Sequence, residues 1–226
     1  MDQIEAILPF LILGPLLVWQ LWRLRAASAE RRAWRAGFLD LCLPLLSDPT
    51  KRIEPDGFAR LAGTHAGARF DLRVVPDTLT TRKLPALWLL VTLTEPQAIQ
   101  ATWHLMMRPR GTETFSGFAR LPHAVPDLPG LPPDSAIRTD EQWGALPAAL
   151  LHVPARLDPE RLKEVVISPK GLRLTWLVEE AHRGRYLAFR DAEMGRTPLP
   201  PEALRPLLAA LLDLQAALGP AERRRA

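Results

Sequence analysis

The residues of this chain that could do chemistry are few and widely spaced. Its five histidines form no pair at metal-ligand spacing, and Cys42 is the only cysteine. The stretch "EEAHRGR" brings Glu179, Glu180 and His182 close together, and carboxylates with an imidazole on one hairpin tip can bind a metal ion. A solvated turn explains the same residues. The sequence therefore predicts no metal site and no bound cofactor.

Motifs for covalent or phosphate chemistry are also missing. No G-x-S-x-G motif occurs, and no glycine-rich loop carries the lysine of a phosphate-binding loop. The stretch "RPRGTET" at 108–114 could hold an anion, although a polar hairpin turn explains it equally well. Cys42 lies among leucines and is predicted to be a small core residue. A serine–histidine–aspartate triad can be dispersed along a chain, so a hydrolase stays open as an alternative.

An apolar segment near the N-terminus sets the expected location of the protein. Seventeen residues without formal charge separate Glu5 from Arg23. As a helix they would span about 26 Å, slightly less than the ~30 Å hydrocarbon core of a bilayer. Acidic residues precede the segment and arginines follow it, which argues against a cleaved signal peptide. We therefore predict a single transmembrane helix over residues 1–24; a buried core helix is the alternative.

The distribution of charge predicts the orientation of that helix. Residues 23–36 carry a net charge of +4 and residues 221–226 carry +2, whereas residues 37–220 sum to zero. A basic flank stays in the cytoplasm, so we predict an outside N-terminus, a cytoplasmic domain and a location in the cytoplasmic (inner) membrane. A nucleic-acid-binding protein would carry its basic charge on the folded domain, so no nucleic-acid partner is expected.

Aromatic and basic side chains are expected at the membrane surface, because the headgroup region favours both. The arginines could equally serve only to set the topology of the helix. The predicted membrane-surface residues are Trp19, Trp22, Arg23, Arg25, Arg31, Arg32, Arg35, Arg223, Arg224 and Arg225.

The remaining chain has the pattern of an α+β protein. After an amphipathic helix, a first half of alternating residues predicts four or five antiparallel strands. A second half combines three strands, the last of them "RYLAFRD", with helices, one of which begins at "DPERLKEV". The polar stretch "SDPTKRIEPDG" before the first strands is expected to be a loop. Leu207, Leu211, Leu214 and Leu218 form the apolar stripe of a C-terminal amphipathic helix. The predicted organisation is an anchor (1–24), a juxtamembrane helix (25–47), one soluble domain of mainly antiparallel strands (48–220) and a basic tail (221–226). Within the soluble domain, a proline-rich loop (122–134) joins two halves, 57–121 and 135–220.

These patterns favour a non-catalytic role. We predict a membrane-anchored accessory, assembly or interaction subunit of a cytoplasmic-membrane complex, with the lipid bilayer and a larger integral membrane complex as partners. Two alternatives remain open. One is a membrane-tethered hydrolase with dispersed catalytic residues. The other is a domain that binds a lipid or a small apolar ligand between the sheet and the C-terminal helix.

Overall fold

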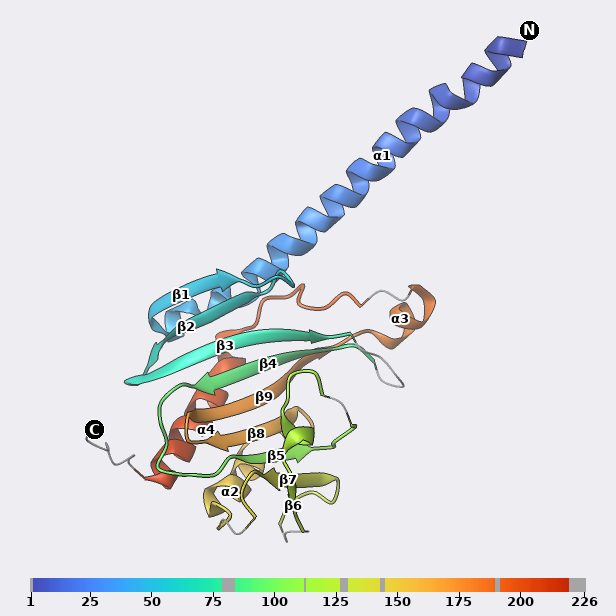
Figure 1. Cartoon of the computed structure of the whole chain (residues 1–226). Coiled ribbons are helices and arrows are strands. Elements are labelled where there is room, and N and C mark those ends of the chain that lie inside the picture. The colour runs from blue at the N-terminus through green and yellow to red at the C-terminus, as the bar shows by residue number, and fades with distance from the viewer. Residues whose placement is uncertain are drawn as a thin grey trace.

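The computed structural model of the chain describes residues 2–78, 84–111, 113–126, 130–142, 145–189 and 192–219, with no account of the side chains of residues 2–12 and 189. A long helix, α1 (Asp2–Gly37), leads into a sheet whose described part has nine strands. Figure 1 shows α1 projecting from the sheet domain, with α2 (Ala148–Arg156) and α4 (Pro201–Leu218) on the domain itself. A further short helix, α3 (Arg183–Phe189), lies at one end of the sheet.

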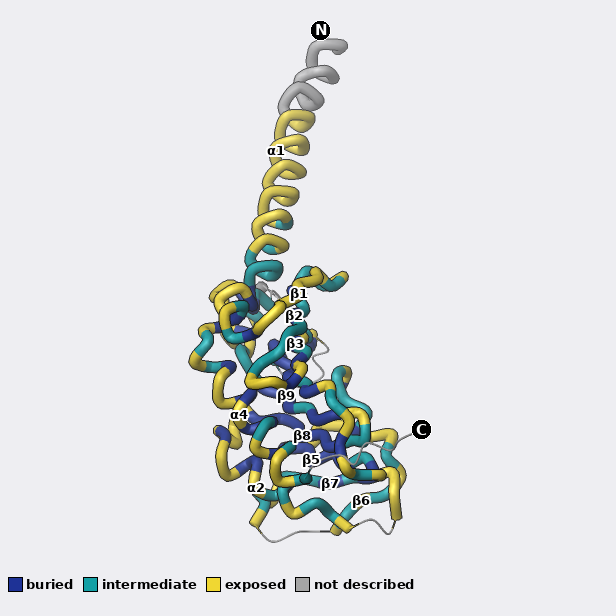
Figure 2. The backbone as a smooth tube through the Cα atoms, turned by 90° about the vertical axis from the view of Figure 1, so that its left-hand side faces the viewer, coloured by how far each residue is buried: buried dark blue, intermediate teal, exposed yellow. Residues whose placement is uncertain are grey.

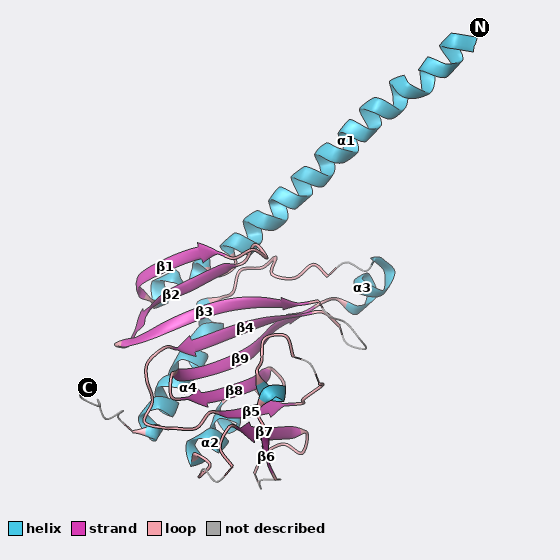
Figure 3. Cartoon of the chain, viewed as in Figure 1, coloured by secondary structure: helices cyan, strands magenta, loops and turns pink. Residues whose placement is uncertain are grey.

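The sheet is antiparallel at every described pairing, and its order is β1-β2-β3-β4-β9-β8-β5-β7-β6 (Figure 3). The hairpin of β8 and β9 comes late in the chain but lies between β4 and β5. The predicted first-half meander and second-half strands are therefore parts of one sheet. The strands are β1 (Ser47–Ile53), β2 (Ala59–His65), β3 (Ala68–Asp77), β4 (Ala86–Leu93), β5 (Trp103–Met107), β6 (His123–Val125), β7 (Ser135–Thr139), β8 (Leu162–Ser168) and β9 (Gly171–Glu180).

The main hydrophobic core lies between the sheet and α4. Leu207 and Leu211 are fully buried, Leu214 is nearly so, and Leu218 packs at the margin of the core. These leucines recur at helical spacing, so one face of α4 meets the sheet and the polar face stays outside. The predicted stripe of the C-terminal helix is thus confirmed as a core element.

The predicted transmembrane helix is wrong. Among the described residues, no helix combines the length and the apolar character that crossing a membrane requires. The predicted anchor is instead the first part of α1, which continues without a break for 36 residues. The uncharged segment before Arg23 has only 17 residues and includes Pro9, Gly14, Pro15 and Gln20, so it is at the lower limit of length and reduced in apolar character for a span of ~20 residues. The fold is therefore a mostly antiparallel nine-stranded sheet with a few helices, and the classification as a single-pass transmembrane protein is overturned.

The first part of the expected juxtamembrane helix (25–47) continues α1 up to its junction with the domain. α1 ends at Gly37, and a separate 3-10 helix, η1 (Asp40–Leu45), follows it. The Arg35 side chain fixes the end of α1, because its Nη1 donates to the carbonyl oxygen of Asp56 at 3.0 Å and its guanidinium lies 5.3 Å from the ring centre of Phe58. Phe38 and Leu39 are buried immediately afterwards. The last turn of α1 and η1 therefore belong to the folded domain.

Three local predictions also differ from the structure. The stretch "RYLAFRD", expected as a strand, lies largely in α3, because β9 leaves the sheet at Glu180. The stretch "DPERLKEV", expected as a helix, is a turn that enters β8; Asp158 Oδ1 accepts from the Glu160 amide at 3.0 Å within that turn. The stretch "SDPTKRI", expected as a loop, is the exposed edge strand β1.

Cys42 is a core residue, as predicted. Its side chain is fully buried, and its thiol donates to the carbonyl oxygen of Leu199 at 3.4 Å. Burial raises the pKa of the Cys42 thiol to about 11, and the charge of Glu202 adds to the effect. A thiol in this state is inert, because only the thiolate is a nucleophile.

We expect Cys42 to resist modification in the folded protein. At pH 8, a pKa raised by about two units lowers the thiolate fraction about 100-fold, and burial slows reagent access further. The measurement is the rate of reaction with Ellman's reagent, compared between the native chain and the chain unfolded in urea. Equal rates in the two states would show that Cys42 is open to solvent.

Candidate functional site

The strand β8 presents two consecutive charged residues to the same face of the sheet. In a regular strand, neighbouring side chains point to opposite faces. Between Leu162 and Glu164 the register with β9 shifts, so Lys163 is an extra residue in a β-bulge. Leu162 and Val165 consequently both join the main core, while Lys163 and Glu164 both contact residues of the segment 104–116. Bulges that re-aim side chains are common beside functional sites, which makes this face the candidate site.

Glu164 is the centre of a buried polar network on that face. Its side chain is fully buried; Oε1 lies 2.8 Å from His104 Nδ1 and also accepts from the Ser116 hydroxyl. Oε2 accepts from Arg173 at 3.0 Å and from Thr175 at 3.4 Å. Burial by itself raises the pKa of Glu164, but the hydrogen bond with His104 and the charge of Arg173 together outweigh it, so the pKa lies below its usual value. The carboxylate is therefore charged at neutral pH and fully partnered.

This network does not have the geometry of a hydrolytic triad. In a triad the carboxylate orients the histidine, and the other ring nitrogen accepts the serine proton. Here Ser116 and His104 meet the same carboxylate oxygen, and the Ser116 oxygen also accepts from the Phe118 amide at 3.0 Å. A carboxylate with a lowered pKa is a weak base, so it does not activate the hydroxyl. Through the hydrogen bond of Ser116 to Glu164, the network instead holds the segment around η2 (Phe118–Arg120) against the sheet.

Lys163 forms a second buried cluster next to the first. Its Nζ lies 3.0 Å from Glu113 Oε1 and donates to the carbonyl oxygens of Met107 at 3.0 Å and Arg108 at 2.6 Å. Burial lowers the pKa of Lys163, and the hydrogen bond and charge of Glu113 partly offset this. All three donor positions of the ammonium group are occupied, so Lys163 serves as a fixed positive charge rather than as a nucleophile.

A hollow of about 330 Å³ opens beside the Lys163–Glu113 pair. Part of its wall is apolar, and the Trp88 and Phe115 rings there lie 5.2 Å apart at 49°. Trp88 Nε1 is buried and has no acceptor among the described residues, which costs about 1–3 kcal/mol. The apolar lining residues are Leu84, Trp88, Phe115 and Leu177. The cationic lining residues are Arg108, Arg110, Arg161 and Lys163.

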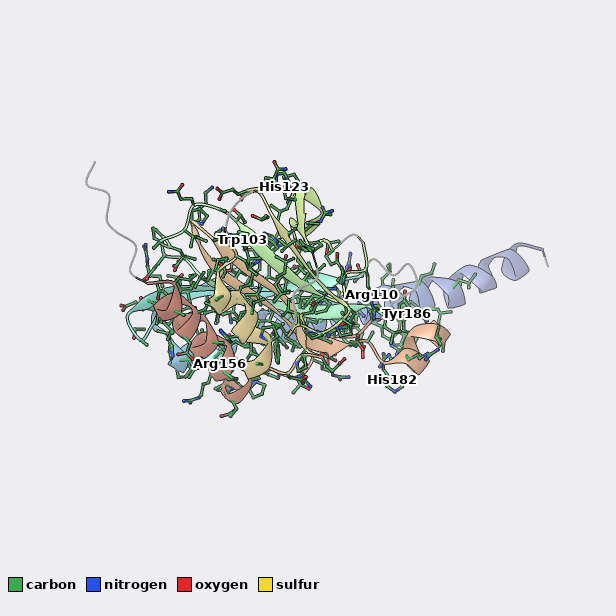
Figure 4. The ribbon with its side chains drawn as sticks, turned by 90° about the horizontal axis from the view of Figure 1, so that it is seen from below. Trp103, Arg110, His123, Arg156, His182 and Tyr186 are labelled. Carbon is green, nitrogen blue, oxygen red and sulfur yellow. The ribbon has the colours of Figure 1, made fainter. Side chains whose placement is uncertain are left out.

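The predicted anion-binding stretch lies partly at this hollow. Arg108 and Arg110 line it, whereas Thr112 is outside the described residues. Figure 4 shows Arg110 toward the α3 end of the domain and Arg156 beside α2 and α4. The Arg108 guanidinium donates to the carbonyl oxygens of Pro159, Glu160 and Leu162 and thereby ties the turn before β8 to the end of β5.

The predicted membrane-surface residues lie mainly along α1. Trp19 and Trp22 are exposed, and the Arg23 guanidinium lies 5.0 Å from the Trp19 ring centre. Arg25 and Arg32 are exposed and Arg31 is half-buried, whereas Arg35 is turned to the domain. Arg223, Arg224 and Arg225 are outside the described residues. Contact of these side chains with lipid stays a prediction.

The residues considered for a metal ion, Glu179, Glu180 and His182, make other contacts in the structure. The Glu179 carboxylate accepts from the Gly195 amide at 2.8 Å, and His182 Nδ1 accepts from the Arg185 amide at 3.3 Å at the start of α3. Among the described residues no group of three histidine, cysteine or acidic side chains could hold a metal ion. Glu180 lines the hollow instead.

The comparisons with known proteins add no functional assignment. No protein-family model matches the chain, and none of the curated proteins is found to be similar to it. The function is therefore argued from the geometry of the molecule alone.

Proposed function

We propose that the chain is a non-catalytic accessory or assembly subunit that attaches to a larger protein complex through α1. The observation that carries the proposal is a group of exposed apolar side chains on α1, which we name the apolar belt. Their exposed fractions lie between 47% and 67%. The apolar belt consists of Leu13, Leu16, Leu17, Val18, Trp19, Leu21, Trp22 and Leu24.

The apolar belt surrounds the helix instead of forming one stripe. At 100° per residue, positions 13–24 cover more than three turns and point in all directions around the axis. A helix that is apolar on every side is normally enclosed, because a single core-facing contact covers only one stripe. The sheet domain does not supply this cover, since Figure 2 shows α1 exposed over most of residues 13–33, before it approaches the domain.

The chemistry around the apolar belt indicates the kind of partner. Arg23 lies within the last turn of the apolar belt, Arg25 and Arg32 follow the belt, and all three are exposed. We therefore expect a protein that encloses the helix between its own apolar elements and presents acidic side chains beside the arginines. That the complex lies at the cytoplasmic membrane stays a prediction, which cell fractionation tests.

Substitution of charged residues into the apolar belt should abolish partner binding. The variant Leu17→Glu/Trp22→Glu places two carboxylates in the enclosed surface, where an unpaired charge is costly. Recovery of the partner with the tagged full chain should fall at least about 10-fold. The matched control is Ala29→Glu, which adds a carboxylate at an exposed position of α1 outside the belt. This control should recover the partner as well as the original chain does.

The recovered protein must then bind the purified chain directly. Binding to the original chain and to Ala29→Glu, but not to Leu17→Glu/Trp22→Glu, supports the proposal. Equal binding by all three chains would show that α1 is not the attachment site. Belt-dependent binding to protein-free lipid vesicles, without a protein partner, would identify lipid as the occupant and overturn the proposed protein complex.

A further inference from the structure

We propose that the hollow beside Lys163 binds a small aromatic monocarboxylate. This inference is independent of α1 and goes beyond the attachment role. It rests on the size of the hollow, on its division into an apolar part and a charged part, and on the excess of cations over carboxylates at its inner wall.

The volume of the hollow limits the ligand to a small molecule. About 330 Å³ is near the lower end of the ~300–1,000 Å³ that ligand pockets usually occupy. One or two rings fit this space better than a lipid chain or a peptide. Among the described residues, buried leucines pack between the sheet and α4, and the hollow between α2 and α4 measures only about 90 Å³.

The apolar part of the wall suits a flat ring. Trp88 and Phe115 lie at a tilted angle that leaves parts of both rings available for edge or offset contacts. Phe115, Leu84 and Leu177 are only half-buried, so a ring placed against them would remove further apolar surface from water. An aromatic body is therefore favoured over a polar one.

The inner wall carries more positive than negative charge. At the inner wall, two cations, Lys163 and Arg108, stand against one carboxylate, Glu113. The Arg108 guanidinium donates to carbonyl oxygens, and because these groups carry no formal charge, they do not neutralise it. Arg110 has no ion-pair partner among the described residues and can close over an anion from the rim. One carboxylate would balance this excess, and the Arg110 guanidinium matches its geometry.

The acidic groups at the rim exclude more highly charged anions. Asp158, Glu160 and Glu180 are exposed at the opening, and Arg161 reaches Asp158 only at 3.9 Å. They would repel a phosphate with a charge near −2 more strongly than a monocarboxylate. The hollow should therefore prefer a ligand with one negative charge over a ligand with two.

Calorimetric titration of the purified full chain with 2-naphthoate tests the proposal. We expect saturable binding of one molecule with a Kd below about 1 mM. Neutral 2-naphthamide should bind at least about 10-fold more weakly, because it lacks the charge, and acetate and phosphate should show no saturation in the same range. Equal binding of naphthoate and naphthamide would overturn the assignment of the cationic wall.

Two variants locate the site, and one serves as control. Arg110→Gln removes the free cation and should weaken naphthoate binding about 10-fold. Phe115→Ala removes a half-buried ring from the apolar wall and should weaken it several-fold; near-ultraviolet circular dichroism verifies that this variant is folded. Arg156→Gln makes the same charge change at the exposed Arg156–Asp213 pair beside α4 and should leave binding unchanged. Equal losses in Arg110→Gln and Arg156→Gln, or no naphthoate binding at all, would overturn the proposal.

Discussion

Replacement of Glu164 with leucine should lower the free energy of unfolding by about 3–4 kcal/mol. The variant leaves His104 and Arg173 facing an apolar side chain at a site where the carboxylate is fully buried. The Arg173 side chain is 25% exposed, so water recovers part of its lost interaction and the effect stays below the largest values for buried pairs. Domains usually have a total stability of only ~5–15 kcal/mol, so urea unfolding will resolve this loss.

A matched control distinguishes the loss of a buried carboxylate from the loss of a negative charge as such. Glu160→Gln removes a carboxylate just before β8, at an exposed position whose side chain has no partner among the described residues. Its unfolding free energy should stay within about 0.5 kcal/mol of the original value. If Glu160→Gln and Glu164→Leu destabilise the protein equally, the buried network is not the source of the effect.

The same network gives the protein a defined acid sensitivity. The folded-state pKa of Glu164 is lowered from 4.5, so the stabilisation is fully present above that value. It is lost as the pH falls through the lowered folded pKa, because the protonated carboxyl no longer balances Arg173. Unfolding curves of the original chain should therefore fall more steeply below pH 4.5 than those of Glu164→Leu. Parallel acid curves would contradict this assignment.

Local patterns in the sequence predicted which side chains face the core. The leucine stripe of α4 is buried as its helical spacing indicates. This succeeds because alternation in a strand and the period of a helix depend on neighbouring residues alone. The strand order depends on pairings between residues far apart in the chain, such as β4 with β9, and local patterns do not contain that information.

The candidate site could not be predicted for a related reason. The stretch "LKEVVIS" holds a charged pair inside an apolar run, which was a usable signal for a buried charge cluster. The preceding Asp158-Pro159 favours a helix start, and this pattern concealed β8. The bulge at Lys163 depends on the register with β9, which is a tertiary property. Likewise, the apolar belt of α1 indicates that the helix is covered, but apolar composition does not distinguish lipid from protein as the cover.

Replacement of Gly171 with alanine should destabilise the protein by about 3 kcal/mol or more, through backbone strain and overpacking together. Gly171 begins β9 directly after the two-residue turn from β8, and its φ is +153°. A Cβ atom at this position would lie 2.3 Å from the carbonyl oxygen of Leu93 on β4. Both groups are backbone in adjoining central strands, so relief of the overlap requires displacement of the β4–β9 pairing.

Gly67→Ala is the control for the steric part of this effect. Gly67 also has a positive φ, +84°, in the turn between β2 and β3, but an added Cβ would meet no atom within 4 Å. Its cost should be limited to about 1 kcal/mol of backbone strain. Thermal and urea unfolding of both variants measure the difference in stability.

The two variants should also differ in naphthoate binding. Because β9 joins β8 to β4, the loss of stability in Gly171→Ala should weaken naphthoate binding at the Lys163 hollow, whereas Gly67→Ala should leave that binding intact. Equal stability of the two variants would show that the close approach of Gly171 to Leu93 does not constrain the sheet.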